Sequence, residues 1–373
     1  MQHLYTSSSR MIKLFKNIAL LILIYFVVSQ FAVNSLPFSW GNTRLNSKYQ
    51  AYKKNADEYN TILMGASTTY RHIDPTILDE YMKENAPDLE IHSFNFGIPA
   101  NRTPQSIYSL NVLLDEYGDN IDYIVLDLSE LTKMGVDNLH KKEMLYWYTK
   151  DNILSIVNTS YESEKGLLNQ IGVPVLYVFS YVEKLLMVGM GAAMLEQHAG
   201  LNVERLSLGP DGNGYYSLDQ EMIDDPEGDL ALRYSILRTQ DTIDFRTEQC
   251  LRLYEKFHDV NSGYSKTMSK ELSKLIKKCN SRDIKIVVML SQRLGDRYEY
   301  LIPLHNSLPE ANKLSYANPS AYPFLNDREN LFDLAHLNKP GSKLFTQLFA
   351  GQFLDRIRQQ QEAGNQYDQK DQK

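Results

Sequence analysis

Two short runs that are apolar at almost every position constrain the fold of this chain most strongly. They read YIVLDL over Tyr123–Leu128 and IKIVVML over Ile284–Leu290. A strand with one face in water alternates apolar and polar residues, whereas a strand of a parallel sheet is covered on both faces and is apolar throughout. The two runs therefore predict central strands of a parallel sheet, with helices packed on both sides of it.

Three further β-like runs and four amphipathic helical patterns complete this picture. The runs are Thr61–Met64, Ile91–Phe96 and a weaker one at Leu314–Ala317. Apolar residues recur at helical spacing in Pro75–Asn85, Pro104–Tyr117, Ser265–Cys279 and Pro340–Arg358. Alternating strands and helices imply right-handed βαβ units. We therefore expect an α/β fold: a flavodoxin-like, doubly wound, mostly parallel five-stranded sheet in three α/β/α layers.

The alternation is interrupted once, so the predicted α/β domain consists of two segments. Residues 46–130 and 258–358 carry the strand and helix patterns, and residues 131–257 between them are expected to form a mainly helical cap over one end of the sheet. The tail, 359–373, is polar and low in apolar residues, which predicts disorder.

One stretch of the insertion, Val173–Leu195, is apolar enough to suggest a second membrane segment. Glu183 and Lys184 lie in its middle, where a bilayer would make two charges costly. A buried or an interfacial helix is therefore favoured over a membrane span.

The N-terminus predicts a membrane anchor in residues 1–45. The basic stretch RMIKLFKN precedes a run of sixteen residues, Ile18–Val33, in which only Ser29 and Gln30 are polar. This run is slightly shorter than the ~20 residues that span a bilayer, and Leu36–Trp40 could lengthen it. Basic residues before the run predict a cytoplasmic N-terminus, a single pass through the inner (cytoplasmic) membrane, and a main domain on the extracytoplasmic, periplasmic side. A cleaved signal peptide is the alternative, although no A-x-A site follows.

Composition excludes several classes of function. The chain of 373 residues has a formal net charge of −7 and a pI of about 5.7, so it offers no basic face and no nucleic-acid partner is expected. The sequence contains no CxxC or HExxH motif, so no metal site and no cofactor are expected. Cys250 and Cys279 would lie where a disulfide could form, or Cys279 could be a buried thiol.

A nucleophile candidate follows the first predicted strand, in ILMGASTTYRHIDP. Ligands of open α/β sheets bind beyond the carboxyl ends of the strands. A serine at position 67, after a small Gly-Ala turn, would present its hydroxyl there, with its own amide and the next one as oxyanion donors. Alternatively, Ser67 or Thr68 only caps the helix. Arg71 and His72 are expected as solvated residues at the helix entry, or as contacts for an acyl donor or an anionic polymer.

An acid–base pair is predicted before the last helix, in FDLAHLNKPG. A serine nucleophile needs a base, and that base needs an acceptor that fixes its tautomer. Asp333, three residues before His336 on a turn, could hold the imidazole through Nδ1–H. Alone, the Asp is typical of a helix cap and the His of a structural residue. Together with Ser67 they predict a Ser-His-Asp triad.

The three motifs ILMGAST, FNFGIPANRT and FDLAHLNKPG resemble those of the SGNH/GDSL hydrolase superfamily. The resemblance covers roughly Tyr59–Leu128 and Ile284–Leu354 and leaves out the insertion. It is closest to the membrane-anchored branch that includes the teichoic-acid D-alanyl transfer protein and polysaccharide O-acetylation proteins. It implies that Ser67 is the nucleophile, that His336 is the general base and then acid, and that Asp333 orients it.

The resemblance also implies an oxyanion hole made by the amides of Ser67 and Gly97. The superfamily usually adds an asparagine from a G-x-N-D motif after the third strand, where this chain has VLDLSEL. Asp127 in that stretch would be a poor oxyanion donor. Asn101, in IPANRT, is the candidate that could replace the missing asparagine.

These features lead to two expected functions. The first is an extracytoplasmic O-acyltransferase or esterase that acts on a cell-envelope glycan or polymer, with a membrane-bound acyltransferase as a possible acyl-donor partner. The second is a catalytically degenerate binding or scaffold subunit of an envelope-modification complex. The intact Ser67, Asp333 and His336 favour the first, and the missing G-x-N-D favours the second.

Overall fold

The computed structural model describes residues 2–131, 141–163, 166–200, 205–236, 239–291 and 298–371. Its centre is a wholly parallel, five-stranded sheet in the order β2-β1-β3-β4-β5. The strands are β1 (Thr61–Gly65), β2 (Ser93–Gly97), β3 (Tyr123–Asp127), β4 (Lys285–Leu290) and β5 (Lys313–Ser315). This is the flavodoxin-like order, so the predicted fold class is confirmed.

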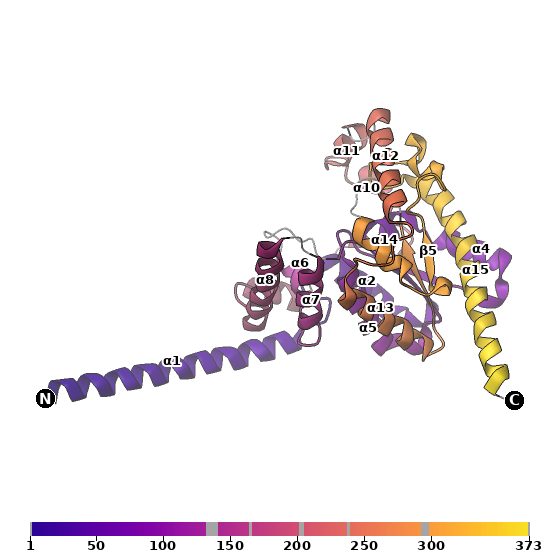
Figure 1. Cartoon of the computed structure of the whole chain (residues 1–373). Helices are drawn as coiled ribbons and strands as arrows, with labels where there is room; N and C mark the ends of the chain where they lie inside the picture. The colour runs from indigo at the N-terminus through magenta and orange to yellow at the C-terminus, as the bar shows by residue number, and fades with distance from the viewer. Residues whose placement is uncertain are drawn as a thin grey trace.

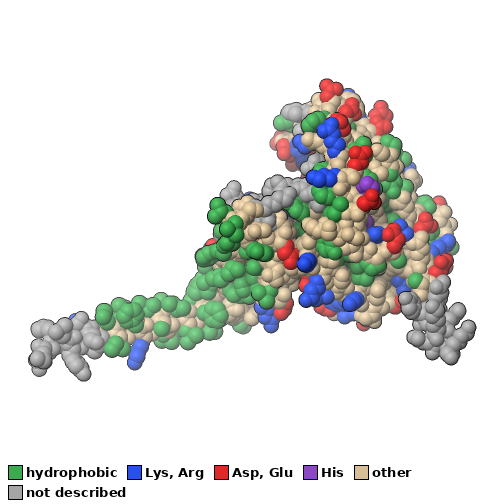
Figure 2. All heavy atoms as spheres, in the orientation of Figure 1, with side chains coloured by type: hydrophobic (Ala, Val, Ile, Leu, Met, Phe, Trp, Pro, Cys, Tyr) green, Lys and Arg blue, Asp and Glu red, His purple; other side chains and the backbone are tan. Residues whose placement is uncertain are grey.

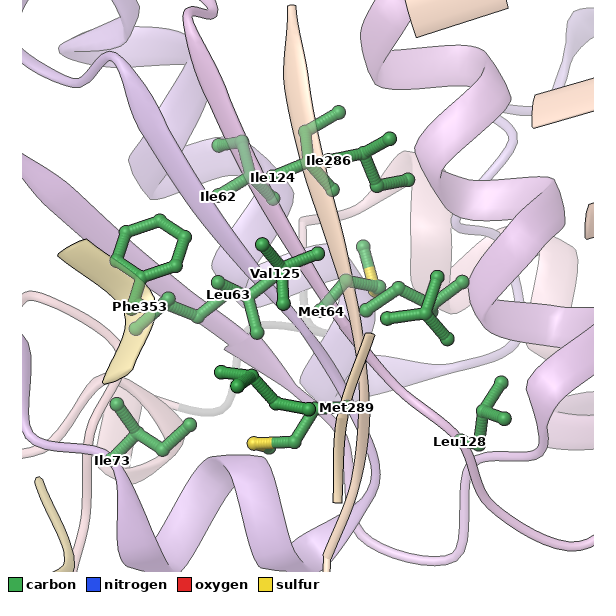
Figure 3. Packing of buried hydrophobic residues seen from close by; sticks show 14 of the residues in the cluster. Ile62, Leu63, Met64, Ile73, Ile124, Val125, Leu128, Ile286, Met289 and Phe353 are labelled. Atoms are coloured by element: carbon green, nitrogen blue, oxygen red, sulfur yellow. The ribbon is translucent and has the colours of Figure 1, made fainter. Parts of the chain in front are cut away.

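The sheet is apolar because both of its faces are covered. Every residue of β1, β2 and β3 is buried, and Figure 3 shows Leu63 and Val125 packed side by side in the core. The pairs of helices α5 with α13 and α4 with α15 contact each other and the sheet strands. Their bounds are Thr103–Tyr117, Lys266–Asn280, Pro75–Asn85 and Lys339–Asp371.

Helix α1 (Gln2–Ser35) projects from the body of the molecule, as Figure 1 shows. Its stretch Arg10–Ser35, 26 residues long, is long and apolar enough to cross a membrane. The span is longer than the predicted run Ile18–Val33 because the preceding basic residues continue the same helix. The helix is therefore not too short to span a bilayer, as the run Ile18–Val33 alone would be. Helix α2 (Thr43–Lys54) follows and packs against β2.

The described part of the insertion is helical, as predicted, but it forms two groups rather than one cap. The first group lies beside the end of α1 in Figure 1 and comprises α6 (Lys142–Leu145), α7 (Ile153–Ser163), α8 (Leu167–Leu186) and α9 (Gly191–His198). The second group comprises η5 (Arg205–Leu208), α10 (Leu218–Asp224), α11 (Leu230–Ile236) and α12 (Gln240–Phe257). Helix α12 packs on α14 (Tyr298–Asn306).

Helix α8 contains most of the apolar stretch that the sequence singled out. Lys184 is buried, and its Nζ donates to the carbonyls of Tyr146 and Tyr148 at 2.9 Å each. Burial lowers the pKa of Lys184 to about 7. The charge that a bilayer would exclude thus faces the protein. The opposite face of α8 is exposed, so of the two expected forms, a buried or an interfacial helix, a fully buried one does not hold.

The structure also bears on two other expectations, the tail and the two cysteines. Helix α15 continues to Asp371, so most of the tail expected to be disordered is helical. Gln, Glu, Ala and Lys are good helix formers, and extending an existing helix needs no new nucleation. Cys250 and Cys279 form no disulfide, and both thiols are buried. Burial raises the pKa of the Cys279 thiol to about 12.

Candidate active site

Ser67 is the first residue of α3 (Ser67–His72), which begins directly after β1. Strands β1 and β3 flank the point where the strand order reverses, the usual ligand site of such sheets. Gly65 permits the close approach of α3 to the strand end, since a Cβ there would lie 2.1 Å from Thr69 Oγ1. Ser67 is half-buried, and its side chain forms no hydrogen bond with any described residue.

Asp333 and His336 lie on a tight loop before α15 that a bridge between Leu331 and Leu337 closes. The predicted hydrogen bond is present: His336 Nδ1 lies 2.9 Å from Asp333 Oδ1. The same oxygen accepts the N–H groups of Ala335 and His336 at 2.8 and 2.9 Å. A carboxylate on Nδ1 fixes the tautomer that leaves Nε2 free to act as a base.

Asp333 has a second partner that the sequence did not reveal. Arg233, on α11, forms an ion pair with Asp333 Oδ2. Burial by itself would raise the pKa of Asp333. The hydrogen bond and charge of His336, the Ala335 N–H and the Arg233 guanidinium outweigh it and hold that pKa well below its usual range. Asp333 is therefore a carboxylate throughout the physiological pH range.

His72, the last residue of α3, connects the serine segment to the histidine loop. Its Nε2 accepts the Leu337 N–H at 3.0 Å, and its ring centroid lies 6.0 Å from that of His336. Its carbonyl accepts hydrogen bonds from two α15 hydroxyls, those of Ser342 and Thr346. One short helix thus carries Ser67 at its start and contacts the loop of His336 at its end.

The expectation that Arg71 and His72 are solvated is wrong, because both are buried. Arg71 donates to the Tyr216 carbonyl at 2.7 Å and forms an ion pair with Glu221 of α10. Its guanidinium also lies 4.2 Å from the centroid of the Tyr70 ring. Arg71 therefore connects the insertion to α3. Sequence patterns indicated a surface position because they gave no sign that the insertion returns to this helix.

Two of the predicted oxyanion donors already form hydrogen bonds within the fold. The Gly97 N–H donates to Asn95 Oδ1 at 2.8 Å. Asn101 Nδ2 donates to Ser106 Oγ at 2.9 Å, and its Oδ1 accepts from the Tyr146 hydroxyl at 3.2 Å. The Gly97 N–H could donate to an oxyanion only if its bond to Asn95 broke, whereas the Asn101 amide carries a second N–H. The Ser67 N–H, at the first position of a helix, has no intrahelical acceptor.

Asn95, in the middle of β2, and Asp127, the last residue of β3, hold α3 in place. Asn95 Nδ2 donates to the carbonyls of Thr69 and Ile73 at 2.7 and 2.8 Å. Asp127 accepts the hydroxyls of Thr68 and Thr69. Asn95 could have been noticed in the sequence, because it is a polar residue inside the otherwise apolar strand FNFG. Asp127 is an acceptor here, as its charge indicated.

No protein-family model matches the sequence, and no curated protein matches it either. Within the described ranges, no three His, Cys, Asp or Glu side chains gather as metal ligands. The assignment of chemistry therefore depends on the motifs and on the contacts described above.

Proposed function

We propose that the chain is a membrane-anchored, extracytoplasmic serine acyl-transfer enzyme of the SGNH type, an O-acyltransferase or esterase acting on cell-envelope polysaccharide. The observation that carries the proposal is the Asp333–His336 hydrogen bond of 2.9 Å. It lies on a loop that contacts α3, whose first residue is Ser67. A buried carboxylate, an imidazole with a fixed tautomer and a strand-end serine are the components of a triad.

The reaction proceeds through an acyl-enzyme. Ser67 Oγ attacks the ester carbonyl while His336 Nε2 takes the hydroxyl proton, and the Ser67 N–H donates to the resulting oxyanion. His336 then protonates the leaving alcohol as the C–O bond breaks. A sugar hydroxyl, or water in the hydrolytic case, next gives its proton to His336 and attacks the acyl carbonyl. The bond between the acyl carbon and Ser67 Oγ then breaks, and His336 returns the proton to Oγ. Asp333 stabilises the imidazolium in both halves.

The membrane anchor serves this chemistry because it determines where the site is located. Helix α1 passes once through the cytoplasmic membrane with its basic end inside, and the α/β domain lies on the periplasmic side. The site is then held near membrane-bound polymer precursors and near a membrane-bound acyltransferase that supplies the acyl group.

Serine-reactive fluorophosphonate tests the proposal on the full chain in detergent. We expect covalent labelling of the wild type, none of Ser67→Ala, and labelling of His336→Ala slowed on the order of a thousandfold. Ser273→Ala, which removes an exposed hydroxyl on α13, is the matched control and should label like the wild type. An unlabelled but folded wild type, or equal labelling of Ser67→Ala, would contradict the enzyme.

A second function, a catalytically degenerate scaffold subunit, is favoured by two observations. The Ser67 hydroxyl forms no hydrogen bond to His336 in the described structure, and the Gly97 N–H is occupied by Asn95. Catalytic hydrogen bonds are often long or poorly aligned in the absence of substrate. The enzyme therefore remains favoured over the scaffold subunit. A wild type that melts cooperatively, stays unlabelled and transfers no acetyl group from p-nitrophenyl acetate to water or oligosaccharide would establish the scaffold.

A further inference from the structure

Helix α8 has an apolar face that the described part of the chain leaves open. Its buried side is formed by Pro174, Tyr177, Ser180 and Lys184. The other side carries large apolar residues that are 41–88% exposed: Leu168, Ile171, Val175, Val178, Phe179 and Val182. Their spacing of three and four residues places them along one stripe. A contiguous stripe of this kind on a protein surface marks an interaction site.

The C-terminal end of α8 is bonded to the membrane span of α1. Tyr25 Oη and Ser29 Oγ donate to the Leu186 carbonyl at 2.6 and 3.1 Å, and Gln30 Nε2 donates to the Leu185 carbonyl at 2.9 Å. The last carbonyls of a helix have no intrahelical partner. Polar side chains in a membrane span likewise need partners, because lipid offers none. The polar side chains of α1 therefore supply the donors that the last carbonyls of α8 need, and those carbonyls supply the acceptors.

These bonds determine how deep α8 lies. At 1.5 Å per residue, Gln30 and Tyr25 lie ~5 and ~12 Å below Val33, the outer end of the apolar run. The end of α8 is then at the level of the outer leaflet. Figure 2 shows apolar side chains continuing from α1 onto the adjoining surface of the body, where Figure 1 places α8.

We infer that the apolar face of α8 lies in the outer leaflet of the membrane, as a second, interfacial contact beside the α1 anchor. The occupant of this face is lipid. The face adjoins a helix whose own exposed residues are apolar, and an amphipathic helix with one open apolar side is the form that interfacial helices take.

The helices around α8 are fixed firmly enough to orient the whole domain. Lys184 ties α8 to the carbonyls of Tyr146 and Tyr148. Glu162, on α7, accepts hydrogen bonds from Ser265 and Thr267 at the start of α13. A single α1 anchor would let the body rotate about the helix axis, whereas a second contact fixes its orientation. This consequence holds whether the protein is an enzyme or a scaffold.

Depth-dependent fluorescence quenching tests the inference on the full chain in nanodiscs. An environment-sensitive NBD maleimide is attached to Phe179→Cys or Ile171→Cys, and lipids with a doxyl quencher on the acyl chain are added. The native Cys250 and Cys279 are buried, so unsubstituted protein is the blank. Leu232→Cys on α11 is the matched control, because Leu232 is also 60% exposed. Leu21→Cys marks the membrane interior.

We expect the labels at positions 179 and 171 to be quenched several-fold more than the label at 232, and nearly as much as the label at 21. Because both positions are exposed, labelling should leave the thermal melting curve unchanged. Quenching at the level of the Leu232→Cys control would overturn the inference. Shielding of these labels only in native membranes, where other proteins are present, would also overturn it and point to a protein occupant.

Discussion

At the scale of single residues, Asp333 joins two parts of the molecule, its own loop and the insertion. It orients His336, accepts two N–H groups of its own loop and forms an ion pair with Arg233 of the insertion. A buried carboxylate is stable only when it is satisfied in this way. The same contacts that would serve catalysis therefore also contribute to folding.

Replacing Asp333 by Asn should reveal that contribution through its pH dependence. The folded-state pKa of Asp333 is depressed, so its stabilisation is fully present above the unfolded value near 3.9 and is lost as the pH falls towards the folded value. Asp333→Asn should lower the free energy of unfolding by ~1–3 kcal/mol at pH 7, and by less at pH 3, where part of this stabilisation has already been lost. Urea unfolding of both proteins at the two pH values measures this. An equal loss of stability at both pH values would mean that the charge of Asp333 is not the cause.

The sequence revealed residues whose signal is local and missed those whose role depends on distant contacts. Ser67 after a strand, and Asp333 three residues before His336, stand out in their own neighbourhoods. His72 and Arg233 do not, since their partners lie 265 and 100 positions away. No local pattern predicts such contacts. The three candidate residues could therefore be picked out from the sequence, but the network of contacts around them could not.

At the scale of elements, the join between α3 and β2 leaves no space for a side chain at Gly97. A Cβ on Gly97 would lie 2.3 Å from Tyr70 N and 2.6 Å from Tyr70 Cα, both backbone atoms. Lys48, from α2, closes the other side by donating to the carbonyls of Asn95, Gly97 and Gly214 at 2.6–2.9 Å. The position of α3, and of Ser67 with it, therefore depends on this glycine.

Gly97→Ala should consequently displace α3. We expect a loss of ~1–3 kcal/mol in stability, the usual result of overpacking, together with slower fluorophosphonate labelling. Gly172→Ala is the matched control. It lies inside α8 with no atom within 4 Å of a built Cβ, so it should stabilise the helix by up to ~1 kcal/mol. Thermal melts and labelling rates of the two variants decide the matter, and a Gly97→Ala protein as stable as the wild type would contradict the packing.

Helices and strands that are buried on both sides were predictable, and those that are buried on one side only were less so. The five strands were found within two residues of their ends. The signal was clearest for β1, β3 and β4, which are apolar at nearly every position because helices cover both faces of the sheet. Helix α8 was ambiguous, since an apolar sequence does not say whether protein or lipid covers it. The tail was misjudged because composition measures the capacity to form a core, and α15 needs none to continue as a helix.

At the scale of the whole molecule, the second group of insertion helices contacts α3, the start of α15 and the loop of His336. Arg71 of α3 pairs with Glu221 of α10. The Lys339 N–H, at the start of α15, donates to Asp219 Oδ2 at 2.7 Å. Arg233 of α11 reaches Asp333. The insertion is thus bonded to the segment that carries Ser67 and to the loop that carries His336.

These bonds predict that the insertion helices and the histidine loop open together. Removing the Arg233 charge takes from the buried Asp333 carboxylate its partner on the insertion, so Arg233→Met should destabilise both sides of the contact. Hydrogen exchange followed by mass spectrometry should show several-fold faster exchange in peptides covering 218–235 and 331–338, with 266–280 unchanged. Arg252→Met, which breaks an exposed pair with Glu248 on α12, should leave both regions as they are. If the loop kept its wild-type exchange in Arg233→Met while 218–235 alone exchanged faster, the insertion would cover the site without stabilising it.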